Sequence, residues 1–128
     1  MAALFANEQH ESFGTWPLGY IPYGGADFGE VAAVAAAVGD GDEDRFHEAW
    51  IAAAARLSAE AEAAEARGHM GSARELHLRA SAFYAASFHP LYGAPVDPRL
   101  LAAFHAQIAA FDRGLALGPH PVRPQRIP

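Results

Sequence analysis

Apolar residues recur every three or four positions in four long stretches of this chain. The stretches cover residues 28–38, 43–67, 72–88 and 98–117. This spacing places apolar side chains on one face of an α-helix. Alanine, the strongest helix former, fills many of the remaining positions. The pattern predicts an all-α fold, a small helical bundle of about four main helices.

Each predicted helix carries one apolar face, and the fourth has the clearest period. The faces consist of Phe28, Val31, Val34, Ala35 and Val38 in the first helix; Phe46, Trp50, Ala53, Leu57, Ala61 and Ala64 in the second; Ala73, Leu76, Ala80, Phe83 and Ser87 in the third; and Leu101, Phe104, Ile108, Phe111 and Leu115 in the fourth. An amphipathic face of this kind normally packs against another element.

Residues typical of helix ends flank these stretches. Asp27 is expected to cap the first helix, and Glu30, three residues later, is expected to close a capping box with it. Gly68 suits the position after the end of the second helix, where a left-handed backbone is common. The other expected N-caps are Asp42 or Asp44 and Asp97, the last followed by Pro98 in the first turn.

Residues 1–26 form an aromatic segment punctuated by Pro and Gly. We expect a short helix near the N-terminus followed by an ordered loop, because such segments rarely form long regular elements. Its rings are Phe5, Phe13, Trp16, Tyr20 and Tyr23. Two interpretations stay open: the rings fill the interior of the bundle, or they line a binding cleft.

The last ten residues, 119–128, contain proline at every second or third position. Proline lacks the backbone N–H that a helix needs, so this stretch is predicted to be extended. We interpret it as a linker between domains.

Composition narrows the possible functions. The 128 residues fit one domain, and the formal net charge of −6 argues against a nucleic-acid-binding surface. All nine basic residues are arginine, and cysteine is absent, which excludes disulfides and thiolate chemistry. Neither a signal peptide nor a membrane-spanning stretch is evident, so we expect a cytoplasmic protein with no membrane partner.

No residue pattern in the chain points to catalysis or to a bound metal. The nucleophile motif Gly-x-Ser-x-Gly is absent. Asp44-x-x-His47 is the nearest approach to a di-metal motif, and it has no second copy. We therefore expect no catalytic residue, no metal and no cofactor. Arg79, in an otherwise small and apolar stretch, is predicted to form a buried ion pair with Glu30 or Glu48.

Several short motifs spread along the chain carry a resemblance to a known family. They are Tyr23-Gly24-Gly25-Ala26-Asp27, Gly29-Glu30, Gly41-Asp42, Trp50, Ala54 with Arg56, Gly68-His69, Ala73-Arg74, Leu78-Arg79-Ala80-Ser81 and Phe83-Tyr84. From about residue 13 to residue 128 the chain resembles the N-terminal helical domain of a group of α/β-hydrolases. The group includes 2,6-dihydroxypseudooxynicotine hydrolase and fungal polyketide-shortening hydrolases.

The resemblance implies a cap domain at residues 27–118, with the segment 1–26 packed on it and residues 119–128 leading to an α/β-hydrolase domain. That domain would hold the serine-dependent machinery for cleaving an ester, or a C–C bond next to a ketone. The expected partners are therefore the catalytic domain, a small aromatic or polyketide-like substrate, and a second copy in a homodimer. Nucleic acid and membrane are not expected. Candidate substrate-binding residues are Trp16, Tyr20, Tyr23, Tyr84, Phe88 and His89.

Two other functions remain open. The predicted hairpin of the second and third helices also suits a stand-alone tetratricopeptide-like interaction module without catalytic activity. A metal- or cofactor-binding bundle is the third hypothesis. The cap and the stand-alone interaction module differ in one prediction. Only the cap hypothesis requires an exposed aromatic patch on the isolated chain.

Overall fold

The structure is a computed structural model, and it describes residues 2–128. The elements in chain order are α1 (Glu8–Thr15), the 3₁₀-helix η1 (Trp16–Tyr23), α2 (Phe28–Val38), α3 (Glu43–Ala66), α4 (Met70–Ser87), the short 3₁₀-helix η2 (His89–Leu91) and α5 (Pro98–Ala116). No strand occurs in this part of the chain, so the prediction of an all-α fold is confirmed.

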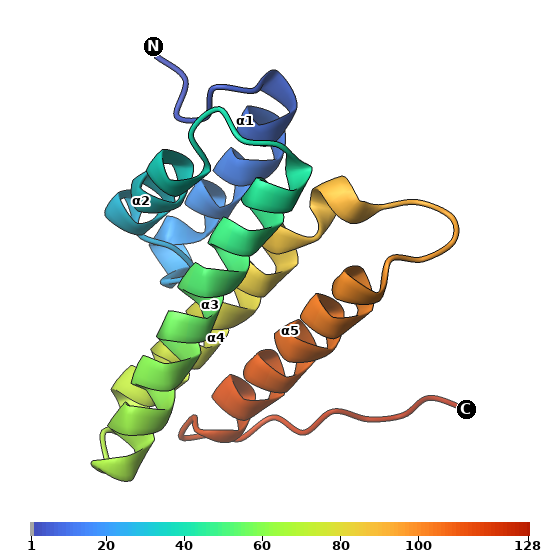
Figure 1. The fold of residues 1–128 in the computed structure, drawn as a ribbon. Coiled ribbons are helices and arrows are strands. Elements are labelled where there is room, and N and C mark those ends of the chain that lie inside the picture. The colour runs from blue at the N-terminus through green and yellow to red at the C-terminus, as the bar shows by residue number, and fades with distance from the viewer. Residues whose placement is uncertain (1) are drawn as a thin grey trace.

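The long helices α3 and α4 form an antiparallel hairpin, which is the centre of the molecule (Figure 1). Helix α5 runs antiparallel to α4 along one side of this hairpin. Helices α1 and α2 and η1 gather at the end of the hairpin opposite its turn. Residues 119–128 leave the end of α5 without regular structure, as predicted.

The predicted caps start and end the helices. Asp27 accepts a hydrogen bond from the backbone N–H of Gly29 at 2.8 Å, and Asp42 accepts one from Arg45 at 3.0 Å. Gly68 ends α3 with a φ of +78°, a left-handed conformation that side chains with a Cβ rarely adopt. The predicted capping box at Asp27 was wrong, because the Glu30 carboxylate instead binds Arg79 across the bundle.

Aromatic rings from three parts of the chain form the main core. Phe46, Trp50 and Phe83 are fully buried, and the ring centroids of Trp50 and Phe83 lie 5.0 Å apart, edge to face. Phe5 joins this cluster from the N-terminal segment. Its backbone N–H donates a 2.8 Å hydrogen bond to Glu11, which holds the segment against α1. These large rings bury much more apolar area per residue than alanine does, so they contribute most to the hydrophobic stabilisation of the core.

The N-terminal segment is more regular than predicted. The short helix is present as α1, but the expected loop after it is η1. Pro17 lies in the first turn of η1, and Gly24 ends it with a φ of +75°. Some of the aromatic rings fill the bundle, as Phe5 does, whereas Tyr20 and Tyr23 are exposed.

Helix α5 packs on α4 through its small residues and not through its regular apolar stripe. Ala103, Ala110 and Gly114 are buried. Leu101, Phe104, Ile108 and Phe111 are 46 %, 42 %, 42 % and 46 % exposed. We call these four residues the α5 stripe. Phe28, the first member of the apolar face of α2, is also exposed.

Candidate functional site

Two adjoining hollows lie between η1, the second half of α4 and α5. The first, about 320 Å³, is lined by Trp16, Tyr20, Tyr23, Gly25, Leu78, Ser81, Ala82, Ala85, Gln107 and Phe111. The second, about 600 Å³, is lined by Trp16, Ala85, Phe88, His89, Tyr92, Val96, Leu100, Leu101, Phe104 and Gln107. Both share Trp16, Ala85 and Gln107, so we treat them as one aromatic groove.

The structure brings five of the six predicted substrate-binding residues to this groove. Tyr20 and Tyr23 line the first hollow, Phe88 and His89 line the second, and Trp16 lines both. The exception is Tyr84, which lies on another flank of α4. It shares one hollow there with Glu65 and His77, and a second with His47 and Arg99.

Five further residues of the groove were not predicted from the sequence to belong to a site: Tyr92, Leu101, Phe104, Gln107 and Phe111. Three of these belong to the α5 stripe. The sequence predicted the helical period of this stripe but not that the stripe would be exposed. A signal was present in the sequence. Ala103, Ala110 and Gly114 repeat at spacings of seven and four, which marks a second, small-residue face that lets two helices approach closely.

The groove holds a chain of aromatic contacts around Trp16 and His89. The Trp16 indole meets the His89 imidazole edge to face, with centroids 5.5 Å apart. Phe13 stacks on His89 with centroids 5.5 Å apart, and Tyr20 meets Trp16 edge to face at 5.2 Å. Burial lowers the pKa of His89 below its ordinary value, because desolvation disfavours the charged imidazolium.

Three polar atoms in the groove wall are buried without a hydrogen-bond partner in residues 2–128. They are Trp16 Nε1, His89 Nε2 and Gln107 Oε1. Unpartnered polar atoms are uncommon in protein interiors, where each costs about 1–3 kcal/mol. No Asp, Glu, Lys or Arg side chain lines either hollow. The groove is therefore an apolar surface that no charged side chain lines, and the three unpartnered atoms of its lining residues are buried beneath it.

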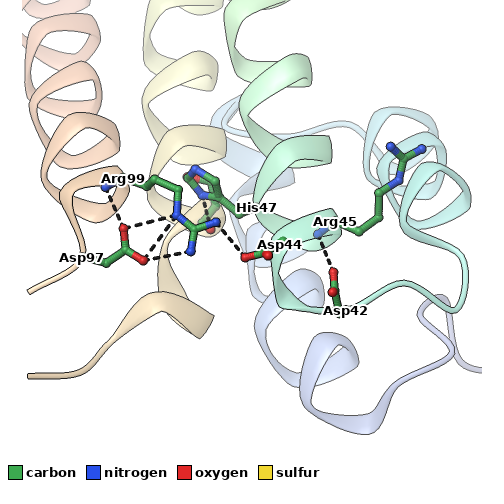
Figure 2. A network of polar contacts seen from close by, with 7 residues as sticks. Asp42, Asp44, Arg45, His47, Asp97 and Arg99 are labelled. Atoms are coloured by element: carbon green, nitrogen blue, oxygen red, sulfur yellow. Dashed lines mark hydrogen bonds and ion pairs between the residues drawn. The ribbon is translucent and has the colours of Figure 1, made fainter.

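A network of ion pairs ties the start of α5 to the start of α3 (Figure 2). Arg99 donates to Asp44 at 2.7 Å and to its neighbour Asp97 at 2.8 Å. His47, one turn after Asp44, donates from Nδ1 to the backbone carbonyl of Ser87 at 3.0 Å. The Asp44-x-x-His47 pair is thus engaged in contacts between helices. No group of three or more potential metal ligands occurs among the described residues.

Two further polar clusters hold the helices in register. Arg79 donates to Glu30 at 3.1 Å and to the Gly24 carbonyl at 3.0 Å, which confirms one of the two predicted ion pairs. Glu65 accepts from Arg113 and, at 2.8 Å, from His77. The pKa of Glu65 is lowered from 4.5 to about 2, chiefly by the hydrogen bonds from Arg113 and further by the one from His77, while burial opposes this shift.

The chain is thus an all-α unit with an open aromatic groove. Comparisons with known proteins identify its relatives. The chain is 40% identical over 111 residues to "Hydrolase LUC6" of Fusarium sp and 38% identical over 111 residues to "20-hydroxy-prefusarin hydrolase FUS2" of Gibberella moniliformis. It is 32% identical over 113 residues to "Alpha/beta hydrolase ucsC" of Acremonium sp. The resemblance to hydrolases is thereby confirmed.

These matches cover 87% of this chain but only 26%, 26% and 23% of the three relatives. The chain therefore spans about a quarter of the length of the curated relatives it matches, and it is related to one segment of these hydrolases. No family model matches the chain. No solved structure matches it either. No helix within residues 2–128 combines the length and apolar character needed to cross a bilayer.

Proposed function

We propose that this chain is the cap of a serine-dependent α/β-hydrolase, and that its aromatic groove and α5 stripe face the catalytic domain. The observation that carries the proposal is the orientation of α5. Its most regular apolar face is nearly half exposed, and three of its four residues line the open groove. Exposed apolar patches of this kind mark interaction sites.

The matched segment of the relatives supports the same assignment. The remaining three quarters of each relative has room for an α/β-hydrolase domain, and all three relatives are named as hydrolases. The exposed aromatic patch that the cap hypothesis requires is present, because Tyr20, Tyr23, Tyr92, Phe104 and Phe111 are all exposed.

In this proposal the chain takes no direct part in bond cleavage. The catalytic domain supplies the nucleophilic serine, its base and the groups that stabilise the oxyanion, for attack on an ester or on a ketone next to the C–C bond that breaks. The cap supplies apolar walls that exclude water and hold an aromatic or polyketide-like substrate near the nucleophile. Assembly as a homodimer and a cytoplasmic location remain predictions.

A chimeric enzyme tests the proposal. This chain replaces the matched 111-residue segment of the Gibberella moniliformis hydrolase. Turnover of a simple ester, p-nitrophenyl butyrate, is then compared with that of the hydrolase lacking the segment. We expect the chimera to hydrolyse the ester and the segment-deleted enzyme to be at least about tenfold slower, since an open pocket loses substrate positioning.

Variants within the chimera locate the contact surface. Phe104→Ser with Ile108→Ser should lower turnover, whereas Met70→Ser, at an equally exposed apolar residue beside the α3–α4 turn, should not. A folded chimera that is no faster than the segment-deleted enzyme contradicts the proposal. The stand-alone interaction module stays untested, and no contact described above favours it over a cap.

A further inference from the structure

Helix α5 is attached to the hairpin through small side chains. Its buried residues are Ala103, Ala110 and Gly114. Helices α3 and α4, in contrast, are joined by large rings such as those of Trp50 and Phe83. Burial stabilises roughly in proportion to apolar area, so an alanine methyl group contributes far less than an aromatic ring. The contact of α5 with α4 is therefore weaker than the contact of α3 with α4.

Open hollows lie on both sides of the contact between α4 and α5. The aromatic groove lies on one side. On the other side, residues of α3, α4 and α5 line two hollows of about 360 and 280 Å³, and both hollows include Tyr84. Helix α5 thus rests on α4 along a narrow line. Fewer atoms are in van der Waals contact there than in a close-packed interior.

Two arginines of α5 reach across to α3, one near each end of α5. Arg99 donates to Asp44 at 2.7 Å (Figure 2), and Arg113 donates to Glu65 at 2.8 Å. We call these two ion pairs the arginine clamps. The Arg99 and Arg113 side chains are 44 % and 53 % exposed. Exposed ion pairs are weak, and salt screens them.

The segments on either side of α5 do not hold it in place. Residues 92–96, which connect η2 to α5, are exposed and lie outside any helix. Residues 119–128, which follow α5, are exposed and have no regular structure. Local opening is easiest where buried apolar contacts are few and the connections are exposed to solvent. Helix α5 meets both conditions.

We infer that α5 opens as a unit, away from α4 and about the connection at residues 92–97, and that the arginine clamps hold it closed. The α3–α4 hairpin stays folded during this motion. Opening carries Leu101, Phe104 and Phe111 away from η1, so it widens the aromatic groove from the α5 side. The motion needs no catalytic domain and is therefore independent of the proposed function. Salt weakens both clamps, so the width of the groove depends on ionic strength.

Hydrogen exchange of the 128-residue chain, followed by mass spectrometry, tests this motion. At low salt the amides of residues 103–111, in the middle of α5, should exchange at least about tenfold faster than those of residues 50–57 of α3. In 1 M NaCl the exchange of α5 should rise by a further factor of about 3 to 10 relative to α3, because the clamps are screened. Equal protection of the two helices would overturn the inference. So would fast exchange confined to the ends of α5, which is fraying.

A variant without the clamps isolates their contribution. Arg99→Gln with Arg113→Gln should speed the exchange of α5 about 3- to 10-fold at low salt and remove its response to salt. Arg56→Gln, at an exposed arginine of α3 outside the clamps, should behave like the parent chain. A salt response that persists without the clamps would contradict their role.

A reversible crosslink distinguishes movement away from α4 from unfolding in place. The chain has no cysteine, so an introduced pair forms the single disulfide. A Cβ at Gly114 would lie 2.8 Å from Leu78 Cγ, close enough for a disulfide between Leu78→Cys and Gly114→Cys. Oxidation should slow exchange in the middle of α5 at least about tenfold relative to the reduced form of the same variant. Identical exchange in the two forms would show that α5 does not leave α4. The comparison of α5 with α3 in the parent chain stands even if this variant does not fold.

Discussion

Gly114 of α5 lies directly against Leu78 of α4. A Cβ at Gly114 would stand 2.7 Å from Cδ2 of Leu78 and 3.3 Å from the Arg74 carbonyl, closer than side chains tolerate. The missing side chain therefore lets the two helices approach, and this approach fixes the rotation of α5 about its axis. With the small face inward, the α5 stripe faces outward along the aromatic groove.

Gly114→Ala should destabilise the chain by about 1–2 kcal/mol, because overpacking at Leu78 outweighs the gain in helix propensity. Gly71→Ala is the matched control, since its new Cβ meets nothing within 4 Å in the first turns of α4. That variant should be neutral or more stable by up to about 1 kcal/mol. Urea unfolding followed by circular dichroism measures both. Equal effects of the two substitutions would refute the close-packing argument.

The Arg79–Glu30 pair joins α4 to the beginning of α2, and removal of the cation should be costly. Arg79→Ala leaves the Gly24 carbonyl and the partly buried Glu30 carboxylate without their donor. We expect a loss of about 1–3 kcal/mol in the free energy of unfolding. Arg56→Ala, at an exposed arginine of α3, should change it by less than about 0.5 kcal/mol. Chemical denaturation of the two variants measures both changes. An equally small loss in both would show that the ion pair does not stabilise the fold.

Glu65 should make the chain sensitive to acid. Its pKa is lowered to about 2 in the folded chain, chiefly by hydrogen bonds from Arg113. A lowered carboxyl pKa stabilises the fold above pH 4.5, and this stabilisation is lost as the pH falls toward 2. The free energy of unfolding should therefore fall less steeply over this range in Glu65→Gln than in the parent chain. Glu60→Gln, at an exposed carboxylate on the same helix, should follow the parent curve.

Polar substitution in the α5 stripe should affect association far more than folding. Phe104→Ser and Ile108→Ser each remove a side chain that is already 42 % exposed, so each should cost only about 1–2 kcal/mol. Phe83→Ala, in the buried core, should cost about 3–5 kcal/mol. Thermal unfolding measures these differences, and light scattering of the parent and variant chains measures self-association. A large loss of stability from the stripe variants would mean that α5 relies on this face for its own packing.

Local signals in the sequence determined the helices and their ends. The apolar faces of the second and third predicted helices are buried as expected, apart from the partly buried Leu76, because the period of 3.6 residues leaves one consistent face toward the hairpin. Asp27, Asp42 and Asp97 cap helices as predicted, since capping depends on residues only two or three positions apart. Of the aromatic residues in the N-terminal segment, Trp16, Tyr20 and Tyr23 were candidate substrate-binding residues, and all three line the groove.

Contacts between distant residues decided the rest. Glu30 had a local partner in the predicted capping box, but Arg79, 49 positions away, binds it more favourably in the folded chain. Tyr84 and Phe88 were both predicted to bind the substrate, yet neighbouring helices divide the two flanks of α4 between different hollows.

The sequence alone determined that four amphipathic helices form and where each begins and ends, because those properties depend on neighbours within one turn. Only the tertiary structure decided which of the two apolar faces of α5 is buried. A small face and a large face both satisfy helical periodicity, and the close approach of Gly114 to Leu78 selects the small one. That selection leaves the large side chains of the α5 stripe exposed beside Trp16 and His89.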